Sequence, residues 1–157
     1  MIQKHFKRPY LDSSVYIAAI NSEPTRVRIV KAILEAADRS EIQLVASTFV
    51  VAEVIRRRGE EHTLSVDHEA EIDSILRSDR ILWVELDFSL AIQARKLARL
   101  HNLRPGDAIH LASAIRGKAD VLLRYDSGFN TTSTLDGIEI CDPYWYGPAT
   151  LFDDANG

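Results

Sequence analysis

The chain has 157 residues, 46% of them hydrophobic and 27% charged, which is typical of one globular domain with its own core. The net charge of −4 argues against a protein that coats nucleic acid, because such proteins are usually basic. No apolar run approaches the ~18 residues of a membrane span, and no apolar segment follows the basic residues 1–9 as in a signal peptide. Cys141 is the only cysteine, which excludes an internal disulfide and a cysteine-based zinc cluster and favours a cytoplasmic protein.

Hydrophobic periodicity predicts alternating strands and helices in the first half of the chain. Apolar residues recur at helical spacing from Val27 to Ala37, whereas IQLVA at 42–46 is a short apolar run typical of a buried strand. In chain order we expect a strand at 10–11, a helix or turn at 15–20, a helix at 25–39, a strand at 42–46, a helix capped at 47–48 that runs through Arg58 to a stop at Gly59, and a polar helix at 66–79.

The second half of the chain continues this alternation. In chain order we expect a strand at 81–86, a helix capped by Asp87 or Ser89 that runs to about His101, a helix from Pro105 to near Gly117, a strand at 121–125, a last strand at Ile138–Cys141, and a tail from Pro143 that packs briefly. Strands separated by helices imply a mainly parallel sheet covered on both faces, which is an α/β fold.

Acidic residues at strand ends are the first candidates for a functional site, because ligands of open parallel sheets bind beyond the carboxyl ends of the strands. Asp12 follows the first strand within LDSSVYI, and a site residue and a helix cap explain it equally well. Asp126 follows VLLRY, and taken alone it is slightly better explained as a turn residue. Asp87 is fully explained by helix capping, and Asp142 by a turn before Pro143.

Two further acids lie within predicted helices. Glu53, in STFVVAEVIRRR, either pairs with an arginine one turn ahead, worth only ~0.2–0.5 kcal/mol, or points into a cleft from the edge of the buried face. Asp107, in RPGDAIHLASAI, stands in a first helical turn, where it suits the helix dipole. Capping does not explain why three other acids occur where a shared cleft would need them. His110 is best explained as a hydrogen-bonded core residue, with orientation of a ligand as the alternative.

Four stretches together resemble the PIN domain, and within it the VapC-type toxin ribonucleases. They are YLDSSVYI, STFVVAEVIRR, LRPGDAIHLASAI and VLLRYDSGF, and they come in the family's order and at roughly its spacing. Each stretch alone is a weak signal, the third is the most specific, and the ordered set covers nearly the whole chain. The resemblance implies a three-layer α/β/α sandwich, with one PIN-like nuclease domain over residues 1–157, a core at about 10–142 and a tail at 143–157.

The resemblance maps the family's four acids onto Asp12, Glu53, Asp107 and Asp126, as catalytic residues and metal ligands. Asp12 and Asp107 would be the principal ligands of Mg²⁺ or Mn²⁺, while Glu53 and Asp126 would complete the site or hold metal-bound water. Close carboxylates repel one another unless a cation is present, and both ions prefer oxygen ligands. The sequence departs from the family at Arg124, where a threonine or serine often stands two positions before the fourth acid.

The expected activity is metal-dependent hydrolysis of RNA phosphodiester bonds by the toxin of a toxin–antitoxin pair. The resemblance implies an RNA substrate, a cognate antitoxin that inserts into or covers the cleft, a homodimer and no membrane partner. Several basic side chains would flank the cleft and contact phosphates as a group, although each taken alone is best explained as a solvated surface charge. They are Arg56, Arg57, Arg58, Arg95, Lys96, Arg99, Arg104, Arg116, Lys118 and Arg124.

Two alternatives compete with the nuclease interpretation. A degenerate domain of the same fold would bind RNA or a protein without cleavage; the four acids argue against it, and Arg124 argues for it. A phosphoryl-transfer domain of the receiver or haloacid-dehalogenase type also places acids at strand ends. That class is disfavoured, because LDSSVYI lacks the second aspartate of a paired-aspartate signature.

Overall fold

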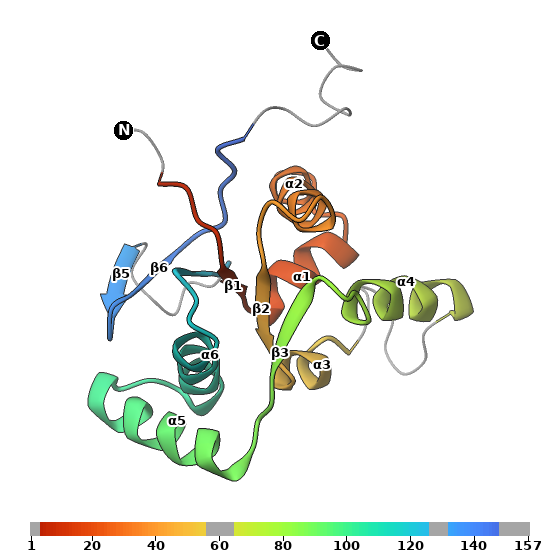
Figure 1. Ribbon diagram of the computed structural model, residues 1–157. Coiled ribbons are helices and arrows are strands. Elements are labelled where there is room, and N and C mark those ends of the chain that lie inside the picture. Colours follow the sequence, from red (N-terminus) through yellow and green to blue (C-terminus); the bar gives the residue numbers. More distant parts are fainter. Residues whose placement is uncertain (1–3, 56–64, 126–131, 148–157) are drawn as a thin grey trace.

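A computed structural model describes residues 4–55, 65–125 and 132–147 (Figure 1). In chain order, two helices follow each of the first three strands, and three further strands come last. No helix in the described ranges is both long enough and apolar enough to cross a membrane. The elements are β1 (Pro9–Leu11), α1 (Ser13–Ile20), α2 (Val27–Asp38), β2 (Leu44–Ser47), α3 (Phe49–Glu53), α4 (Val66–Leu76), β3 (Ile81–Val84), α5 (Phe88–His101), α6 (Pro105–Arg116), β4 (Val121–Leu123), β5 (Thr132–Leu135) and β6 (Ile138–Cys141).

The strands form a six-stranded sheet in the order β3-β2-β1-β4-β6-β5. Every neighbouring pair is parallel except β5 and β6, which are antiparallel. Tyr10 of β1 pairs with Val45 of β2 on one side and with Leu122 of β4 on the other. The chain therefore places β2 and β3 on one side of β1 before it places β4, β5 and β6 on the other side. The carboxyl end of β1, between those of β2 and β4, is the place where a ligand site is expected in such a sheet.

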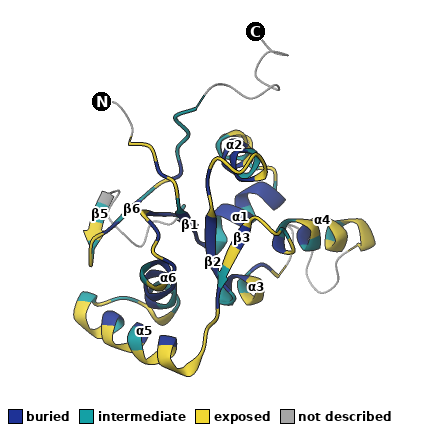
Figure 2. Cartoon of the chain, viewed as in Figure 1, coloured by how far each residue is buried: buried dark blue, intermediate teal, exposed yellow. Residues whose placement is uncertain are grey.

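The two faces of the sheet build two hydrophobic cores, because successive side chains of a strand point to opposite sides. Leu11, Leu44 and Leu123 pack with α1, α2 and α4 in one core, whereas Tyr10 and Val45 pack with α5 and α6 in the other. Figure 1 shows these two groups of helices on opposite sides of the sheet, and Figure 2 shows that β1 and β2 are buried while α5 is exposed along its outer side. The predicted three-layer α/β/α sandwich with a mainly parallel sheet is confirmed.

The aromatic tail packs against the N-terminal segment, as predicted for its first residues. The Tyr144 hydroxyl donates a hydrogen bond to the Lys4 carbonyl (2.7 Å), and the Tyr146 hydroxyl donates one to the Phe6 carbonyl (2.6 Å). The Phe6 ring lies edge-on to both tyrosine rings. These contacts hold the described part of the tail beside the core that contains α1 and α2.

The prediction that the helix beginning at residues 47–48 runs through Arg58 is wrong. This helix, α3, ends at Glu53, because Val54 leaves the helical conformation (φ −86°, ψ 79°) and buries its side chain in the core. Residues 56–58 lie outside the described ranges. The early end leaves Glu53 in the last turn of a short helix.

Strand β5 was not expected from the sequence. It forms a hairpin with β6 through Asp136 and Gly137, whose φ angles are 49° and 80°. Two successive residues with positive φ are typical of the tightest hairpin turn, for which Asp-Gly is a preferred sequence. The Asp-Gly pair before IEIC was therefore the signal for this strand.

The turn after α6 is closely packed at Gly117. A Cβ atom at this position would lie 2.5 Å from Val45 Cγ1 and 3.2 Å from both Val84 Cγ2 and the Ser113 carbonyl oxygen. We expect Gly117→Ala to lower the free energy of unfolding by ~1–3 kcal/mol, since the buried neighbours must shift. Urea denaturation measures this change. Gly106→Ala is the control, because its Cβ would meet only the Phe49 ring at 3.5 Å; equal losses in the two variants would contradict the prediction.

Candidate active site

A pocket of about 290 Å³ lies at the carboxyl end of β1. Asp12 follows β1, Glu53 ends α3, and Asp107 stands in the first turn of α6. Three of the four predicted site residues thus line one pocket, although they are far apart in the sequence. The fourth, Asp126, lies outside the described residues. The lining residues are Asp12, Ser13, Ser14, Glu53, Arg104, Gly106, Asp107, His110 and Tyr125.

Asp12 is both a helix cap and a pocket residue, so the two explanations left open by the sequence are compatible. Its Oδ1 accepts hydrogen bonds from the backbone N–H of Ser14 (2.9 Å) and from the Ser14 hydroxyl. The residue is only 5% exposed. Burial raises the pKa of the Asp12 carboxyl, although interactions with His110, Ser14 and Arg124 lower it. A cation bound here would relieve the cost of keeping this carboxylate ionised.

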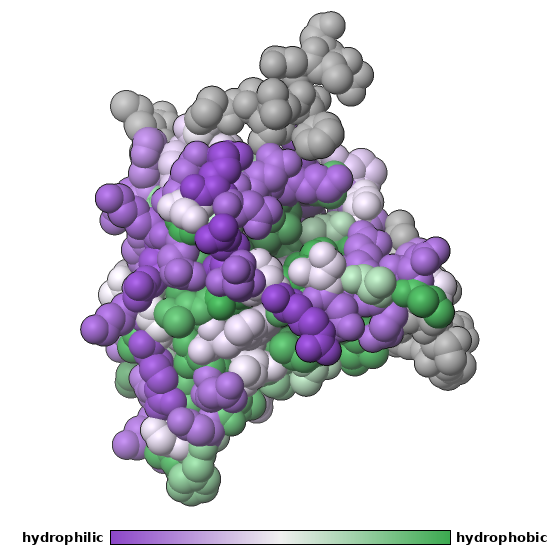
Figure 3. Space-filling view, turned by 45° about the vertical axis from the view of Figure 1, so that its right-hand side comes forward, coloured by the Kyte–Doolittle hydropathy of each residue, from purple (hydrophilic) through white to green (hydrophobic). Residues whose placement is uncertain are grey.

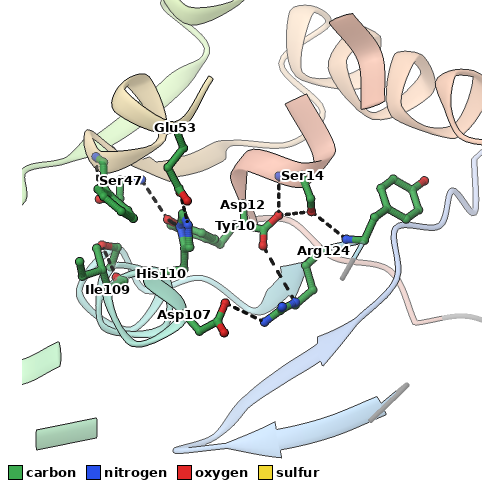
Figure 4. A network of polar contacts seen from close by, with 12 residues as sticks. Tyr10, Asp12, Ser14, Ser47, Glu53, Asp107, Ile109, His110 and Arg124 are labelled. Atoms are coloured by element: carbon green, nitrogen blue, oxygen red, sulfur yellow. Dashed lines mark hydrogen bonds and ion pairs between the residues drawn. The ribbon is translucent and has the colours of Figure 1, made fainter. Parts of the chain in front are cut away.

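Arg124 brings a positive charge to the two aspartates of the pocket. Its backbone N–H donates to the Cys141 carbonyl (3.1 Å) just beyond β4, which holds its main chain beside β6. Its Nε lies 4.0 Å from Asp12 Oδ2, and its Nη1 lies 3.4 Å from Asp107 Oδ1. Figure 4 shows the guanidinium between the two carboxylates. At 4% exposure Arg124 is not a surface contact for phosphate, and that sequence-based expectation is wrong.

Glu53 belongs to a chain of hydrogen bonds that ends in the core. Its Oε1 lies 2.6 Å from His110 Nε2, and His110 Nδ1 lies 2.6 Å from the Tyr10 hydroxyl (Figure 4). The Tyr10 oxygen accepts a hydrogen bond from the Ser47 N–H (3.2 Å). Burial raises the pKa of Tyr10 well above its usual value, so this phenol keeps its proton.

This chain assigns the protons of His110. The Tyr10 oxygen already accepts the Ser47 N–H, so its own proton is donated to His110 Nδ1. In the neutral imidazole the single proton then resides on Nε2 and is donated to Glu53 Oε1. His110 is the hydrogen-bonded core residue expected from the sequence, and it also orients Glu53. The expected pairing of Glu53 with an arginine one turn ahead falls on residues 56–57, outside the described ranges.

Asp107 is placed by the start of α6. Arg104 is the N-cap and Pro105 the first helical residue, so Asp107 lies in the turn where a negative charge favours the helix. Its side chain is 19% exposed, and Oδ1 faces Arg124 Nη1. The carboxylate therefore stands at the junction of the pocket and the buried guanidinium.

The donor chemistry of the pocket suits a hard divalent cation. Its carboxylates come from Asp12, Glu53 and Asp107, and oxygen is the ligand atom that Mg²⁺ and Mn²⁺ prefer. The chain itself already stabilises a cation between Asp12 and Asp107. Among the described residues, no three His, Cys, Asp or Glu side chains converge as a metal centre. The observed contacts agree with this, since Glu53 is directed toward His110 and the two aspartates toward Arg124.

Three polar residues of the site were not identified from the sequence. Ser14 bonds to Asp12 and accepts the Tyr125 N–H (2.8 Å), and Tyr10 and Ser47 complete the chain to His110. A serine two residues after an aspartate is a known local hydrogen-bonding pattern, so a signal for Ser14 was present. Tyr10 lies in an apolar strand, and only the fold shows where its hydroxyl finds a partner.

Two of the basic residues predicted to flank the cleft differ in position, whereas Arg56, Arg57 and Arg58 lie outside the described ranges. Arg104 is exposed at the rim of the pocket, where an RNA phosphate could reach it. Arg116 lies at the other end of α6 and donates to Asp87 (3.0 Å) and Ser89 (2.7 Å). Asp87 caps α5, accepting from the Leu90 N–H at 2.8 Å, as predicted.

Comparison with known proteins gives one family. The family model described as "PIN domain" matches residues 10–135, which include all four predicted site residues. No match to the sequence was found among curated proteins.

Three solved structures share the fold at 17% sequence identity. VapC20 of Mycobacterium tuberculosis, described as a toxin that cleaves the sarcin–ricin loop, has a TM-score of 0.60 over 76% of this chain and 91% of its own. VapBC2 of Rickettsia felis, bound to a DNA fragment of its promoter, has a TM-score of 0.59 over 86% and 98%. FitAB, bound to the IR36 DNA fragment, has a TM-score of 0.52 over 90% and 99%. At this identity the likeness establishes the fold alone.

Proposed function

The chain belongs to the PIN domain family, and from this premise we propose that it is a single-domain, Mg²⁺- or Mn²⁺-dependent endoribonuclease and the toxin of a toxin–antitoxin pair. One observation carries the proposal. Carboxylates from three separate elements, Asp12, Glu53 and Asp107, line one pocket at the carboxyl end of the central strand. Capping and the helix dipole account for the positions of Asp12 and Asp107, but not for Glu53, which stands at the end of α3 and lines the same pocket.

The residues of the pocket have distinct proposed roles. Asp12 and Asp107 hold the ion, and Asp126 is proposed as a further ligand. When bound, the ion supplies Lewis-acid chemistry, making a water more acidic and offsetting charge on the scissile phosphate. Glu53, fixed by His110 Nε2, faces the pocket as an acceptor for a proton of the attacking water. Arg104 at the rim contacts an RNA phosphate and positions the substrate.

We also propose an RNA substrate, a cognate antitoxin that covers the pocket, and a homodimer in the cytoplasm. The structural matches include a toxin described as cleaving the sarcin–ricin loop and two structures described as VapBC2 and FitAB, and these names support the proposal. Apolar side chains reach the surface among hydrophilic ones (Figure 3), and Phe88 and Leu100 of α5 are 82% and 70% exposed. An apolar pocket of about 260 Å³ beside α5, lined mainly by Ala91, Ala94, Ala98, Pro105 and Ile109, supports a protein partner. The single cysteine, Cys141, suits a reducing compartment.

A second candidate is a degenerate PIN domain that binds RNA or protein without cleavage. The buried Arg124 favours it, because a cation already contacts both principal carboxylates. Metal-dependent cleavage separates the two candidates.

The deciding experiment incubates purified protein and labelled RNA with Mg²⁺, with Mn²⁺ or with chelator, alongside Asp107→Asn. We expect cleavage that requires the ion and falls at least ~100-fold in the variant, because loss of a ligand should exceed the loss caused by changing a residue behind a ligand. Asp79→Asn is the matched control, since the Asp79 side chain is 91% exposed and lies outside the pocket.

Two other outcomes would contradict part or all of the proposed function. If nothing is cleaved but the ion stabilises the wild type and not Asp107→Asn, the metal site stands and the RNA substrate is wrong. If the ion neither activates nor stabilises the protein, the degenerate domain is the better description.

A further inference from the structure

Arg124 is a cation built into the carboxylate site. It reaches Asp12 through Nε and Asp107 through Nη1, and its side chain is only 5% exposed. An arginine guanidinium is charged at physiological pH, so the site carries a built-in positive charge. The Arg124 main chain is bonded to Cys141, and its side chain is enclosed by the surrounding protein, which limits its movement.

Burial of an arginine costs desolvation free energy, which nearby anions can offset. Here part of that compensation comes from Asp12 and Asp107, the two strongest candidates for metal ligation. The charge of Arg124 also acts on Asp12 by lowering the pKa of its carboxyl, against the effect of burial. Arg124 and a divalent ion would therefore bind the same two carboxylates, those of Asp12 and Asp107.

The charges of the described residues suggest how many ions the site can hold. Asp12, Glu53 and Asp107 are three anions when ionised, and Arg124 cancels one of them. The remaining two negative charges are balanced by a single divalent cation. Even when Asp126, proposed above as a further ligand, adds a third negative charge, a second divalent ion would leave an excess of positive charge in a partly buried pocket, which costs free energy.

We infer that Arg124 is a resident cation that competes with divalent metal for Asp12 and Asp107, so that the site takes up at most one ion and binds it more weakly than the same carboxylates would without Arg124. The inference rests on the metal site of the proposed function and not on RNA cleavage.

The test measures Mn²⁺ binding without RNA, by titration calorimetry and by electron paramagnetic resonance of free Mn²⁺. We expect the wild type to bind at most one ion per chain. Arg124→Gln, which removes the charge and keeps a polar side chain, should bind Mn²⁺ at least ~10-fold more tightly, since a like charge a few ångströms from the ion is gone. Arg124→Lys keeps the charge and should stay near the wild-type affinity.

Arg104→Gln is the matched control, because Arg104 lines the same pocket but is exposed and screened by solvent. Its effect on Mn²⁺ affinity should be several-fold smaller than that of Arg124→Gln. Equal gains in the two variants would show only a general effect of net charge and would overturn the inference. An unchanged or weaker affinity in Arg124→Gln would mean that Arg124 merely holds the carboxylates in place, and would overturn it too.

Thermal melting shows whether the Arg124→Gln variant is folded. Addition of Mn²⁺ should raise the melting temperature of Arg124→Gln more than that of the wild type. If Arg124→Gln does not fold even with Mn²⁺, the wild-type stoichiometry decides: one ion supports the inference, and two ions or none overturn it. These measurements of Mn²⁺ binding and melting contain no RNA, so they can be interpreted even if the separate assay shows no RNA cleavage.

Discussion

Replacing Asp12 by Asn should yield a protein that cleaves RNA at least ~100-fold more slowly than the wild type yet is at least as stable in the absence of metal. Activity is lost because Asn cannot supply the negative charge that holds the ion. The helix cap survives, because the Asn side-chain oxygen can accept the same Ser14 N–H. Asp107 remains to pair with Arg124.

The stability of this variant follows from the direction of the Asp12 pKa. Burial raises it, so the fold favours the protonated carboxyl more than the unfolded chain does. The stability linked to that proton is fully present below the unfolded pKa, about 4, and is lost as pH rises through the folded pKa. Asn carries no charge at any pH, so the variant escapes this loss. Its advantage over the wild type should appear as pH rises toward neutrality and vanish near pH ~3.

Asp87 provides a control of opposite sign, since it also caps a helix but is exposed. The Leu90 N–H and then Arg116 lower the pKa of the Asp87 carboxyl. Its contribution to stability is present above the unfolded pKa and is lost as pH falls through the folded pKa. Asp87→Asn should therefore be less stable than the wild type at neutral pH. Urea denaturation of the two variants in chelator across pH 3–8 measures both curves; parallel curves would contradict the assignment.

His110→Leu should lower RNA cleavage by ~10–100-fold, the usual loss when the residue that orients a ligand is removed. His110 holds Glu53 through a 2.6 Å contact, and leucine offers no donor. The variant should also lose stability by ~1–3 kcal/mol, because the buried Tyr10 hydroxyl loses its acceptor. Denaturant titration and initial rates of RNA cleavage measure the two effects separately.

A double variant distinguishes orientation of Glu53 from mere support of the core. Tyr10→Phe combined with His110→Leu removes the stranded hydroxyl, so part of the lost stability should return, although the Ser47 N–H then loses the acceptor that Tyr10 supplied. Cleavage should stay low, because Glu53 remains without its donor. Recovery of cleavage together with stability would mean that His110 acts only through folding. His101→Leu is the matched control, because His101 also pairs with a carboxylate, Asp136, at 2.7 Å, but outside the pocket; it should leave cleavage unchanged.

The parts of this protein that could be predicted from sequence are those with local causes. Pro105 at the first position of a helix, Asp87 as a cap and the period of apolar residues along α2 are all determined within a few residues. The same holds for the placement of Asp12 at a strand end, since the strand and the turn after it are both local. Three layers then follow from the alternation of strands and helices.

The parts that could not be predicted depend on contacts between distant segments. The partner of Glu53 is His110, 57 positions away, rather than a neighbour on its own helix. Arg124 resembles a surface charge in the sequence, and its burial arises only when β4 lies beside β1 with α6 packed nearby. The end of α3 is likewise determined by burial of Val54 in the core, and helix propensities contain no information about this burial.

Tyr10 belongs to the hydrophobic core and to the site at once. It is fully buried, pairs with strands on both sides, and anchors the imidazole that orients Glu53. For directed evolution the consequence is that residues needed for folding and residues needed for activity cannot be varied separately in this part of the protein. Libraries that vary the layer between the sheet and α6 and are selected only for folding will alter turnover as well. Suppressors of a sluggish variant should therefore be sought in apolar positions beside Tyr10 as much as around the carboxylates.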